Sequence, residues 1–354
     1  MFSKRFKQLT PYTPGEQPQN RKYIKLNTNE NPYPPSPLVE KYLKTADTNL
    51  LKLYPDPGSQ ELREAIGKYY NIPSSMVFTG NGSDEVLSFC FFAFFDNDNG
   101  SLLFPEHSYS FYPVYCGFYD IPFKRIPMET DLSISVDTYT EETDYSGIIF
   151  PNPNAPTGTY LEVTEIEQLM RKVHSNRVVI IDEAYIDFGG KSAVSLIDKF
   201  NNLLIVQTFS KSRSLAGLRV GFAMGNEMLI SALNTVKDSF NSYPLDKLAQ
   251  NAARIAMEDK EHFNNNCSKI IKTRKFTVKV LKNLGWEVLP SRANFIFIQK
   301  KGISGSEIYK TLKNKGLLVR YFGHKGIENF VRVTIGKKEN MEVFLELLET
   351  TWGN

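Results

Sequence analysis

The segment TFSKSRSLAGLRVG holds a lysine that could act as a nucleophile. Lys211 directly follows an apolar run that is typical of a strand. It lies among Ser210, Ser212, Arg213 and Arg219. Nearby cations and partial burial lower the pKa of a lysine, which makes its amine available to condense with an aldehyde. A surface lysine in a loop would also fit, because the chain has 42 Lys and Arg residues, so the other segments must decide.

An acid and a tyrosine follow another apolar run, in VVIIDEAYIDF. Asp182 ends the strand expected at 178–182, so its carboxylate emerges at the edge of the sheet where ligands bind. A bound pyridine nitrogen paired with this carboxylate would stay protonated, which lets the ring act as an electron sink for a carbanion. Tyr185 could hydrogen-bond a ring oxygen. An acidic helix cap would give the same local pattern.

A glycine turn stands before an apolar helix in FTGNGSDEVL. Gly80, Gly82 and Ser83 form the expected turn, and exposed amides at a helix N-terminus bind phosphate. A lone GxG is weak evidence, and the third glycine of a dinucleotide-binding motif is missing. GGKS at 189–192 lacks the earlier glycine of a nucleotide triphosphate loop, since Tyr185 stands at that position. Binding of a nucleotide triphosphate is therefore rejected.

Composition excludes several classes of protein. The net charge of +3 arises from charges spread along the chain, without the basic block that tracks nucleic acid. The three cysteines form no CxxC pair, which favours a reducing, cytoplasmic location. The longest apolar run, 86–95, is about half of the ~20 residues that a membrane span needs, and the N-terminus lacks the apolar region of a secretory signal. No metal site is expected, because no zinc-site spacing joins His107, His174, His262 and His324.

Strands and helices alternate through the middle of the chain. Strands are expected at 147–150, 178–182, 203–208 and 219–224. A helix after the first strand would begin with a capping box of Thr164 and Glu167. Its apolar face would carry Ile166, Leu169, Met170 and Val173. Such alternation predicts a mostly parallel sheet with helices on both faces.

The length of 354 residues predicts more than one domain. We expect an N-terminal arm and small-domain segment at 1–45, a large domain at 46–246 and a C-terminal small domain at 247–354. Ser59 would cap the first helix of the large domain. The small α+β domain would contain a helix at 268–284, a strand at 295–299, a further helix, and two strands ending in VRVTIG. A ligand would bind in the cleft between the domains.

In this order, the segments resemble those of the pyridoxal 5'-phosphate-dependent aminotransferases of fold type I, class II, and specifically the histidinol-phosphate aminotransferase family. The similarity covers nearly the whole chain. It rests on nine motifs in order, which are YTPGEQ, LNTNENP, LYPDPGSQELR, GNGSDE, NPNAPTG, DEAYIDF, TFSKSRSLAGLRVG, SRANF and VRVTIG. The resemblance implies an α/β fold in which a large domain with a mostly parallel sheet joins a smaller α+β domain and an N-terminal arm.

The resemblance implies roles for the matching residues. Lys211 would carry pyridoxal 5'-phosphate as a Schiff base and move a proton between substrate and cofactor. Asp182 would pair with the ring nitrogen, Tyr185 with the ring hydroxyl, and Tyr109 would stack on the ring. The remaining cofactor contacts would come from Gly82, Ser83, Asp84, Ser210, Arg219 and, from the neighbouring subunit of a homodimer, Tyr54.

The substrate would be held by two arginines. Arg332 would bind the α-carboxylate of glutamate as a bidentate fork. Arg320 and Tyr12 would contact the distal phosphate or carboxylate, and Asn29 would also contact the substrate. The implied reaction is reversible amino transfer between L-histidinol phosphate and 2-oxoglutarate, with glutamate as the donor in reverse, in L-histidine biosynthesis.

One position departs from the family pattern. Many relatives have an asparagine directly before PTG that contacts the ring oxygen, and here that position is Ala155. Asn154 would take over the contact, and the bond between Ala155 and Pro156 could be cis. An aromatic amino acid aminotransferase and a threonine-phosphate decarboxylase remain alternatives with the same lysine. A non-catalytic protein that kept the fold is disfavoured by the presence of Lys211, Asp182 and Arg332.

Overall fold

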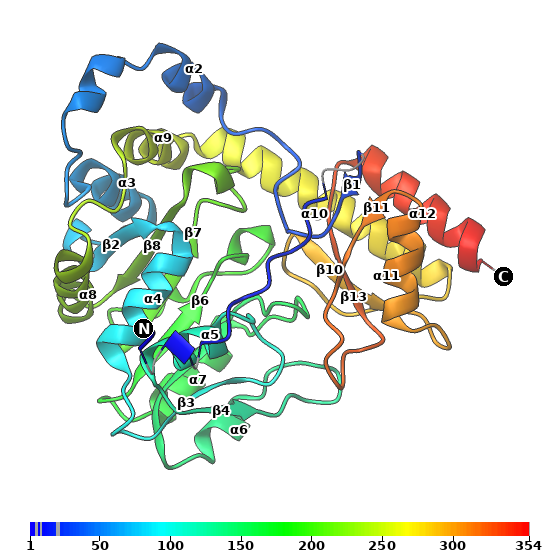
Figure 1. Ribbon diagram of the computed structural model, residues 1–354, viewed down its shortest axis with the longest axis horizontal. Coiled ribbons are helices and arrows are strands. Elements are labelled where there is room, and N and C mark those ends of the chain that lie inside the picture. Colours follow the sequence, from blue (N-terminus) through cyan, green and yellow to red (C-terminus); the bar gives the residue numbers. More distant parts are fainter. Residues whose placement is uncertain (4–5, 8, 19–21, 354) are drawn as a thin grey trace.

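The computed structural model describes residues 1–3, 6–7, 9–18 and 22–353. Its largest feature is a seven-stranded sheet with the order β2-β8-β7-β6-β5-β3-β4 (Figure 1). β8 runs antiparallel to both of its neighbours, and the other pairs are parallel. The strands are β2 (Val77–Asn81), β3 (Ser101–Pro105), β4 (Phe123–Ile126), β5 (Tyr145–Pro151), β6 (Val178–Asp182), β7 (Leu203–Thr208) and β8 (Val220–Gly225). The predicted mostly parallel sheet is confirmed.

The observed strand boundaries agree closely with those predicted from the sequence. β6 and β7 have the predicted bounds, and β5 is longer than the predicted 147–150. β8 begins at Val220 because Arg219 has a φ of 53°, a left-handed conformation that an extended strand cannot contain.

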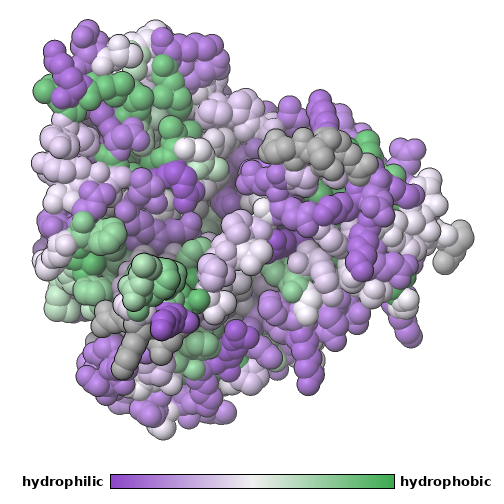
Figure 2. All heavy atoms as spheres, viewed as in Figure 1, coloured by the Kyte–Doolittle hydropathy of each residue, from purple (hydrophilic) through white to green (hydrophobic). Residues whose placement is uncertain are grey.

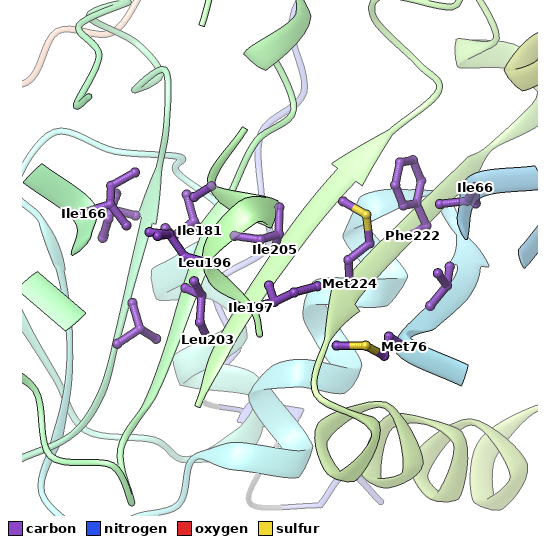
Figure 3. Close-up of a cluster of buried hydrophobic side chains, with 14 of the residues drawn as sticks. Ile66, Met76, Ile166, Ile181, Leu196, Ile197, Leu203, Ile205, Phe222 and Met224 are labelled. Atoms are coloured by element: carbon purple, nitrogen blue, oxygen red, sulfur yellow. The ribbon is translucent and has the colours of Figure 1, made fainter. Parts of the chain in front are cut away.

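Alternation along the strands builds a separate core on each face of the sheet. Ile148, Ile181 and Ile205 belong to one core, while Ile149 and Ile180 belong to the other, because successive side chains of a strand point to opposite faces. The first core (Figure 3) is covered by α3 (Gln60–Tyr70), α7 (Val163–Lys172) and α9 (Lys247–Glu258). The second is covered by α4 (Gly82–Phe94), α5 (Tyr112–Tyr119) and α8 (Glu227–Phe240).

Two predicted helix caps are wrong. Ser59 precedes α3 but has a φ of 47° and makes no side-chain cap. The amide of Gln60 instead donates to the carboxylate of Asp56 at 2.6 Å. The capping box of α7 is formed by Glu162 and Glu165, so the helix begins before the predicted Thr164. In both cases a nearby acid stabilises the free amides of the first turn more strongly than a hydroxyl.

A smaller part of the chain forms an antiparallel sheet with the order β12-β13-β10-β9. Its strands are β9 (Glu287–Val288), β10 (Phe295–Gln299), β12 (Arg320–Tyr321) and β13 (Val331–Thr334). It packs on α10 (Lys260–Asn283), α11 (Gly305–Asn314) and α12 (Lys338–Trp352). α10 begins before the predicted Ser268, because Asp259 accepts the amide of His262 and caps it. We call these sheets and helices, with β1 and β11 below, the small unit.

The N-terminal arm joins both parts of the molecule (Figure 1). β1 (Ile24–Lys25) pairs in parallel with β11 (Leu317–Leu318) of the small unit. Further along, α2 (Pro37–Thr45) packs beside α9. The segment between them therefore crosses from one part to the other. Among the described residues, no helix is both long and apolar enough to cross a bilayer.

Candidate active site

A cavity of about 240 Å³ lies where β5, β6 and β7 end and the small unit begins. Its wall contains most of the predicted site residues, which are Tyr12, Asn29, Ser83, Asp84, Tyr109, Asp182, Tyr185, Ser210, Lys211, Arg219, Arg320 and Arg332. Carboxyl ends of parallel strands are the usual binding edge of such a sheet. Residues from both ends of the chain thus meet at one site.

Lys211 is fixed at this wall by the N-terminal segment LNTNENP. Its Nζ donates to the carbonyl of Thr28 at 3.1 Å and lies 5.9 Å from the centre of the Tyr185 ring. The backbone carbonyl of Lys211 accepts from the side chain of Asn31 at 3.0 Å. The amine is therefore close to the predicted ring-binding tyrosine.

Asp182 is a buried acid at the end of β6. Its carboxylate accepts from the hydroxyl of Tyr112 and from the amide of Ala184, each at 3.1 Å. Burial raises the pKa of Asp182 to about 6, although these two donors and the charge of Lys211 oppose the rise. The charged form lacks an ion-pair partner of its own among the described residues, so a bound cation would stabilise it.

The N-terminus of α4 packs directly on β8. A Cβ at Gly221 would lie 2.3 Å from the amide nitrogen of Ser83. A Cβ at Gly82, whose φ is +81°, would lie 2.5 Å from Nη2 of Arg219. Arg219 in turn forms an ion pair with Asp84 at 3.1 Å. This packing brings the free amides of the helix N-terminus and a guanidinium together, an arrangement that suits a phosphate.

Two further groups complete this end of the cavity. The hydroxyl of Tyr109 donates to Asp84 at 2.8 Å, and burial, with the Asp84 charge beside it, raises the pKa of Tyr109. Ser210 accepts from the hydroxyl of Thr208 at 3.0 Å. The side chains of Tyr109 and Ser210 both line the cavity, and these hydrogen bonds hold them there.

At the other end, the small sheet turns Arg332 toward the cavity. Val331 and Val333 lie in the core of the small unit, so the alternation of β13 directs Arg332 to the opposite face. Its guanidinium lies 5.2 Å from the ring of Phe295 and 5.3 Å from that of Phe322. Burial lowers its pKa. Its Nε is buried and has no hydrogen-bond partner among the described residues, which leaves a donor for an anion.

Arg320 lies beside Arg332. The two residues pair in register between β12 and β13, and the Arg320 guanidinium is 5.6 Å from the same Phe322 ring. Arg320 donates to the carbonyls of Thr13 and Pro14, at 3.2 and 3.3 Å. The neighbouring Tyr12 packs on Phe111, with the ring centres 4.8 Å apart. The N-terminal arm thus covers the arginine end of the cavity.

Comparison with known proteins agrees with this geometry. Residues 21–348 match the family of class I and II aminotransferases. The chain belongs to this family.

Similar proteins align with this aminotransferase over almost its full length. A histidinol-phosphate aminotransferase of Syntrophus aciditrophicus is 54% identical, covering 99% of this chain and 97% of that protein. One from Pseudomonas entomophila is 49% identical, covering 97% of each. The solved structure of histidinol-phosphate aminotransferase from Sinorhizobium meliloti with pyridoxal 5'-phosphate has a TM-score of 0.88, with 18% identity, covering 99% of this chain and 98% of that one. That structure supports the predicted fold.

As a member of this family, the aminotransferase depends on pyridoxal 5'-phosphate. Its cavity fits the cofactor in three respects. Asp182 is a buried acid that forms no ion pair in the described part of the chain, which suits a protonated ring nitrogen. The amides of α4 with Arg219 suit the phosphate, and Lys211 offers the amine that can bond to the aldehyde.

Three predicted site residues do not line the cavity of the aminotransferase. Gly82 packs against the guanidinium of Arg219. Asn154 is buried, and its amide donates to the carbonyl of His107 and the hydroxyl of Thr157, each at 2.9 Å. The wall is formed by Ala155 and Pro156, joined by a cis bond. The buried Oδ1 of Asn154 has no hydrogen-bond partner among the described residues, and its contact with the ring oxygen stays a prediction. Tyr54 is 80% exposed and stacks on Tyr243 at 4.7 Å.

Sequence reasoning missed some residues that build the site. Tyr112 was not predicted to contact Asp182, and Phe322 was not predicted to support the two arginines. The strand pattern around Arg320 offered one signal, because Arg320 and Phe322 alternate with Val319 and Tyr321. The contact of Tyr112 gave no signal, since it joins side chains 70 residues apart.

Proposed function

We propose that the chain catalyses reversible amino transfer between L-histidinol phosphate and 2-oxoglutarate, in L-histidine biosynthesis. The observation that carries this proposal is the identity of 54% and 49%, over nearly the whole chain, with proteins named histidinol-phosphate aminotransferase.

The arginine end of the cavity supports a substrate of this kind. Arg332 and Arg320 lie on one side of the cavity and share the Phe322 ring. Two guanidinium groups so close together repel each other, and a doubly charged phosphate or a dicarboxylate would relieve that repulsion. Arg332 binds the α-carboxylate of glutamate, and Arg320 with Tyr12 binds the distal phosphate or carboxylate.

The residues of the chain divide the chemistry among them. When bound, pyridoxal 5'-phosphate supplies a ring that stabilises the negative charge left on the substrate α-carbon after it loses its proton. Lys211 Nζ would take that proton from the α-carbon and pass it to the cofactor, and would carry it the other way in the reverse direction. The Asp182 carboxylate keeps a proton on the ring nitrogen, and the Tyr185 hydroxyl binds the ring oxygen. Ser83, Asp84, Ser210 and Arg219 hold the phosphate.

Steady-state kinetics with several amino donors test the substrate assignment. We expect kcat/KM for histidinol phosphate to exceed the values for phenylalanine, tyrosine and phosphothreonine. Arg320→Ala should lower kcat/KM for histidinol phosphate by at least about 30-fold and that for phenylalanine by much less, because a charge-assisted pair contributes about 2 kcal/mol. Higher values for phenylalanine in the unchanged chain, or equal losses in the variant, would contradict the assignment.

A cytoplasmic homodimer is part of the same proposal. All three cysteines are buried free thiols, as a reducing compartment allows. Leu50, Leu51, Leu53 and Tyr54 are exposed, and apolar side chains gather over this part of the molecule at the upper left of Figure 2. Exposed apolar clusters of this kind commonly pack against a partner. Tyr54 would there reach the cofactor phosphate of the neighbouring subunit.

Light scattering and a cofactor titration test this arrangement. The mass in solution should be that of two chains, and Tyr54→Ala should weaken cofactor binding although Tyr54 lies outside the cavity of its own chain. A monomer that binds cofactor fully, or a Tyr54 variant with unchanged affinity, would refute it.

A further inference from the structure

A short chain of hydrogen bonds joins the small unit to Tyr185. The amide N–H of Asn29 donates to Oγ1 of Thr334 at 2.9 Å. Oγ1 of Thr334 donates to Oδ1 of Asn29 at 3.0 Å. The side-chain amide of Asn29 donates to the hydroxyl oxygen of Tyr185 at 3.0 Å. Asn29 lies in LNTNENP, and Thr334 is the last residue of β13.

The direction of every proton in this chain is determined. A backbone N–H can only donate, so the hydroxyl oxygen of Thr334 accepts from Asn29. The single hydroxyl proton of Thr334 is then directed to Oδ1 of Asn29, which must be the carbonyl oxygen. The NH2 group of Asn29 therefore faces Tyr185. Tyr185 accepts that bond and its own proton is left for another acceptor.

That acceptor must come from the cavity. The hydroxyl of Tyr185 makes no other hydrogen bond within the described part of the chain, and Tyr185 lines the cavity. Ala155, which lines the cavity beside Pro156, offers no hydrogen-bonding side chain. The orientation of the Tyr185 hydroxyl thus depends on Asn29.

Asn29 is held firmly for this task. Its residue exposure is 1% and its φ is 54°, a left-handed conformation that asparagine adopts more readily than most residues. The backbone carbonyl of Asn29 accepts a hydrogen bond from the side-chain amide of Asn294 at 3.0 Å. Thr334 is two residues from Arg332 on β13, so both face the cavity side of the small sheet.

We infer that Asn29 is a positioning residue that turns the Tyr185 hydroxyl toward the ring oxygen of the cofactor, and that Thr334 ties this contact to the strand that carries Arg332. The inference rests on the proposed function, because it needs the cofactor in the cavity. Asn29 also lines the cavity, and its role as a substrate contact stays a prediction. Ala155 cannot donate to the ring oxygen, so Tyr185, held by Asn29 and Thr334, is the donor that this proposal assigns.

The pKa of the covalent link between Lys211 and the cofactor reports the contact. A hydrogen bond donated to the ring oxygen stabilises its anionic form, which lowers the pKa at which the link loses its proton. The visible absorbance of the holoenzyme, recorded against pH, gives this pKa without any turnover. Tyr185→Phe removes the donor and should raise the pKa by about one, a tenfold change in proton affinity.

Asn29→Asp is the sharpest variant. It preserves shape and tolerates the left-handed backbone, but a carboxylate can only accept from Tyr185, so the tyrosine proton turns away from the cavity. We expect the pKa of the link to rise by about one. Thr334→Val should raise it as well, because Oδ1 of Asn29 then has no donor and the amide can flip. Thr334→Ser keeps the hydroxyl and should leave the pKa unchanged.

The double variant separates a relay from a local charge effect. Because Asn29 acts through Tyr185, adding Asn29→Asp to Tyr185→Phe should leave the pKa where Tyr185→Phe placed it. A further rise in the double variant would mean that the new charge acts directly, and would overturn the inference. An unchanged pKa in Asn29→Asp would overturn it too. Absence of a visible band in the unchanged chain would instead contradict the proposed function.

Discussion

Asp182→Asn should make the cofactor-free protein more stable at neutral pH. Asp182 is 5% exposed, and burial raises its pKa from 3.8 to about 6. The folded state therefore resists the charge that this carboxyl carries in the unfolded chain. Asparagine has nearly the same shape and can still accept from Ala184 or Tyr112, so the substitution removes the buried charge and little else.

The sign and size of the effect follow from proton linkage. Between pH 3.8 and about 6 the folded state binds more protons than the unfolded state, so stability falls as the pH rises through this window. Below it, both states are protonated and the variant gains nothing. Above it, the full difference applies, and a rise of about two in pKa corresponds to about 3 kcal/mol.

Urea unfolding of both cofactor-free proteins, at several values between pH 4 and 8, measures the difference. Glu183 is also buried, with a pKa raised to about 7, but it is common to both proteins and largely cancels. The gap in unfolding free energy should be near zero at pH 4 and should grow to about 3 kcal/mol above pH 6.5. A gap that does not change with pH would refute the assignment of Asp182 as an uncompensated acid awaiting a cation.

Two further substitutions test the two ends of the cavity. Arg332→Lys removes the planar guanidinium beside Phe295 and Phe322, together with its unpartnered Nε. The KM for glutamate should therefore rise by at least about 10-fold in initial-rate kinetics. An unchanged KM would rule out the binding of the substrate carboxylate by Arg332. Gly221→Ala places a Cβ 2.3 Å from the Ser83 nitrogen and must push the N-terminus of α4 away. Cofactor titration should therefore show at least about 10-fold weaker binding. The free energy of unfolding should fall by about 1–3 kcal/mol. Gly217→Ala is the matched control, since a Cβ there meets nothing within 4 Å, and equal losses in both variants would contradict the packing argument.

Burial explains which strands could be predicted from the sequence. β6 and β7 are buried along nearly their whole length, so the apolar runs 178–181 and 203–206 mark where the two strands lie. Helix starts were harder, because Asp56 and Glu162 compete with the expected hydroxyl caps over a few residues. Local propensity cannot decide such a competition.

The site itself was partly visible in the sequence. Residues in contiguous motifs, such as Lys211 and Asp182, follow strands whose edge is predictable. Contacts over long separations were not: Asn29 and Thr334 are 305 residues apart, and no periodicity links them. Asn154 was predicted from its place beside Ala155, but only the fold determines that its NH2 group binds the carbonyl of His107.

The most direct test of the central claim is the visible absorbance of the purified protein with pyridoxal 5'-phosphate. The claim is that the amine of Lys211, in the cavity with Asp182, holds this cofactor covalently. The unchanged chain should show a visible band that survives gel filtration, and Lys211→Ala, folded by circular dichroism, should lose the band. A variant that keeps the same band, or an unchanged chain that never shows one, would contradict the account.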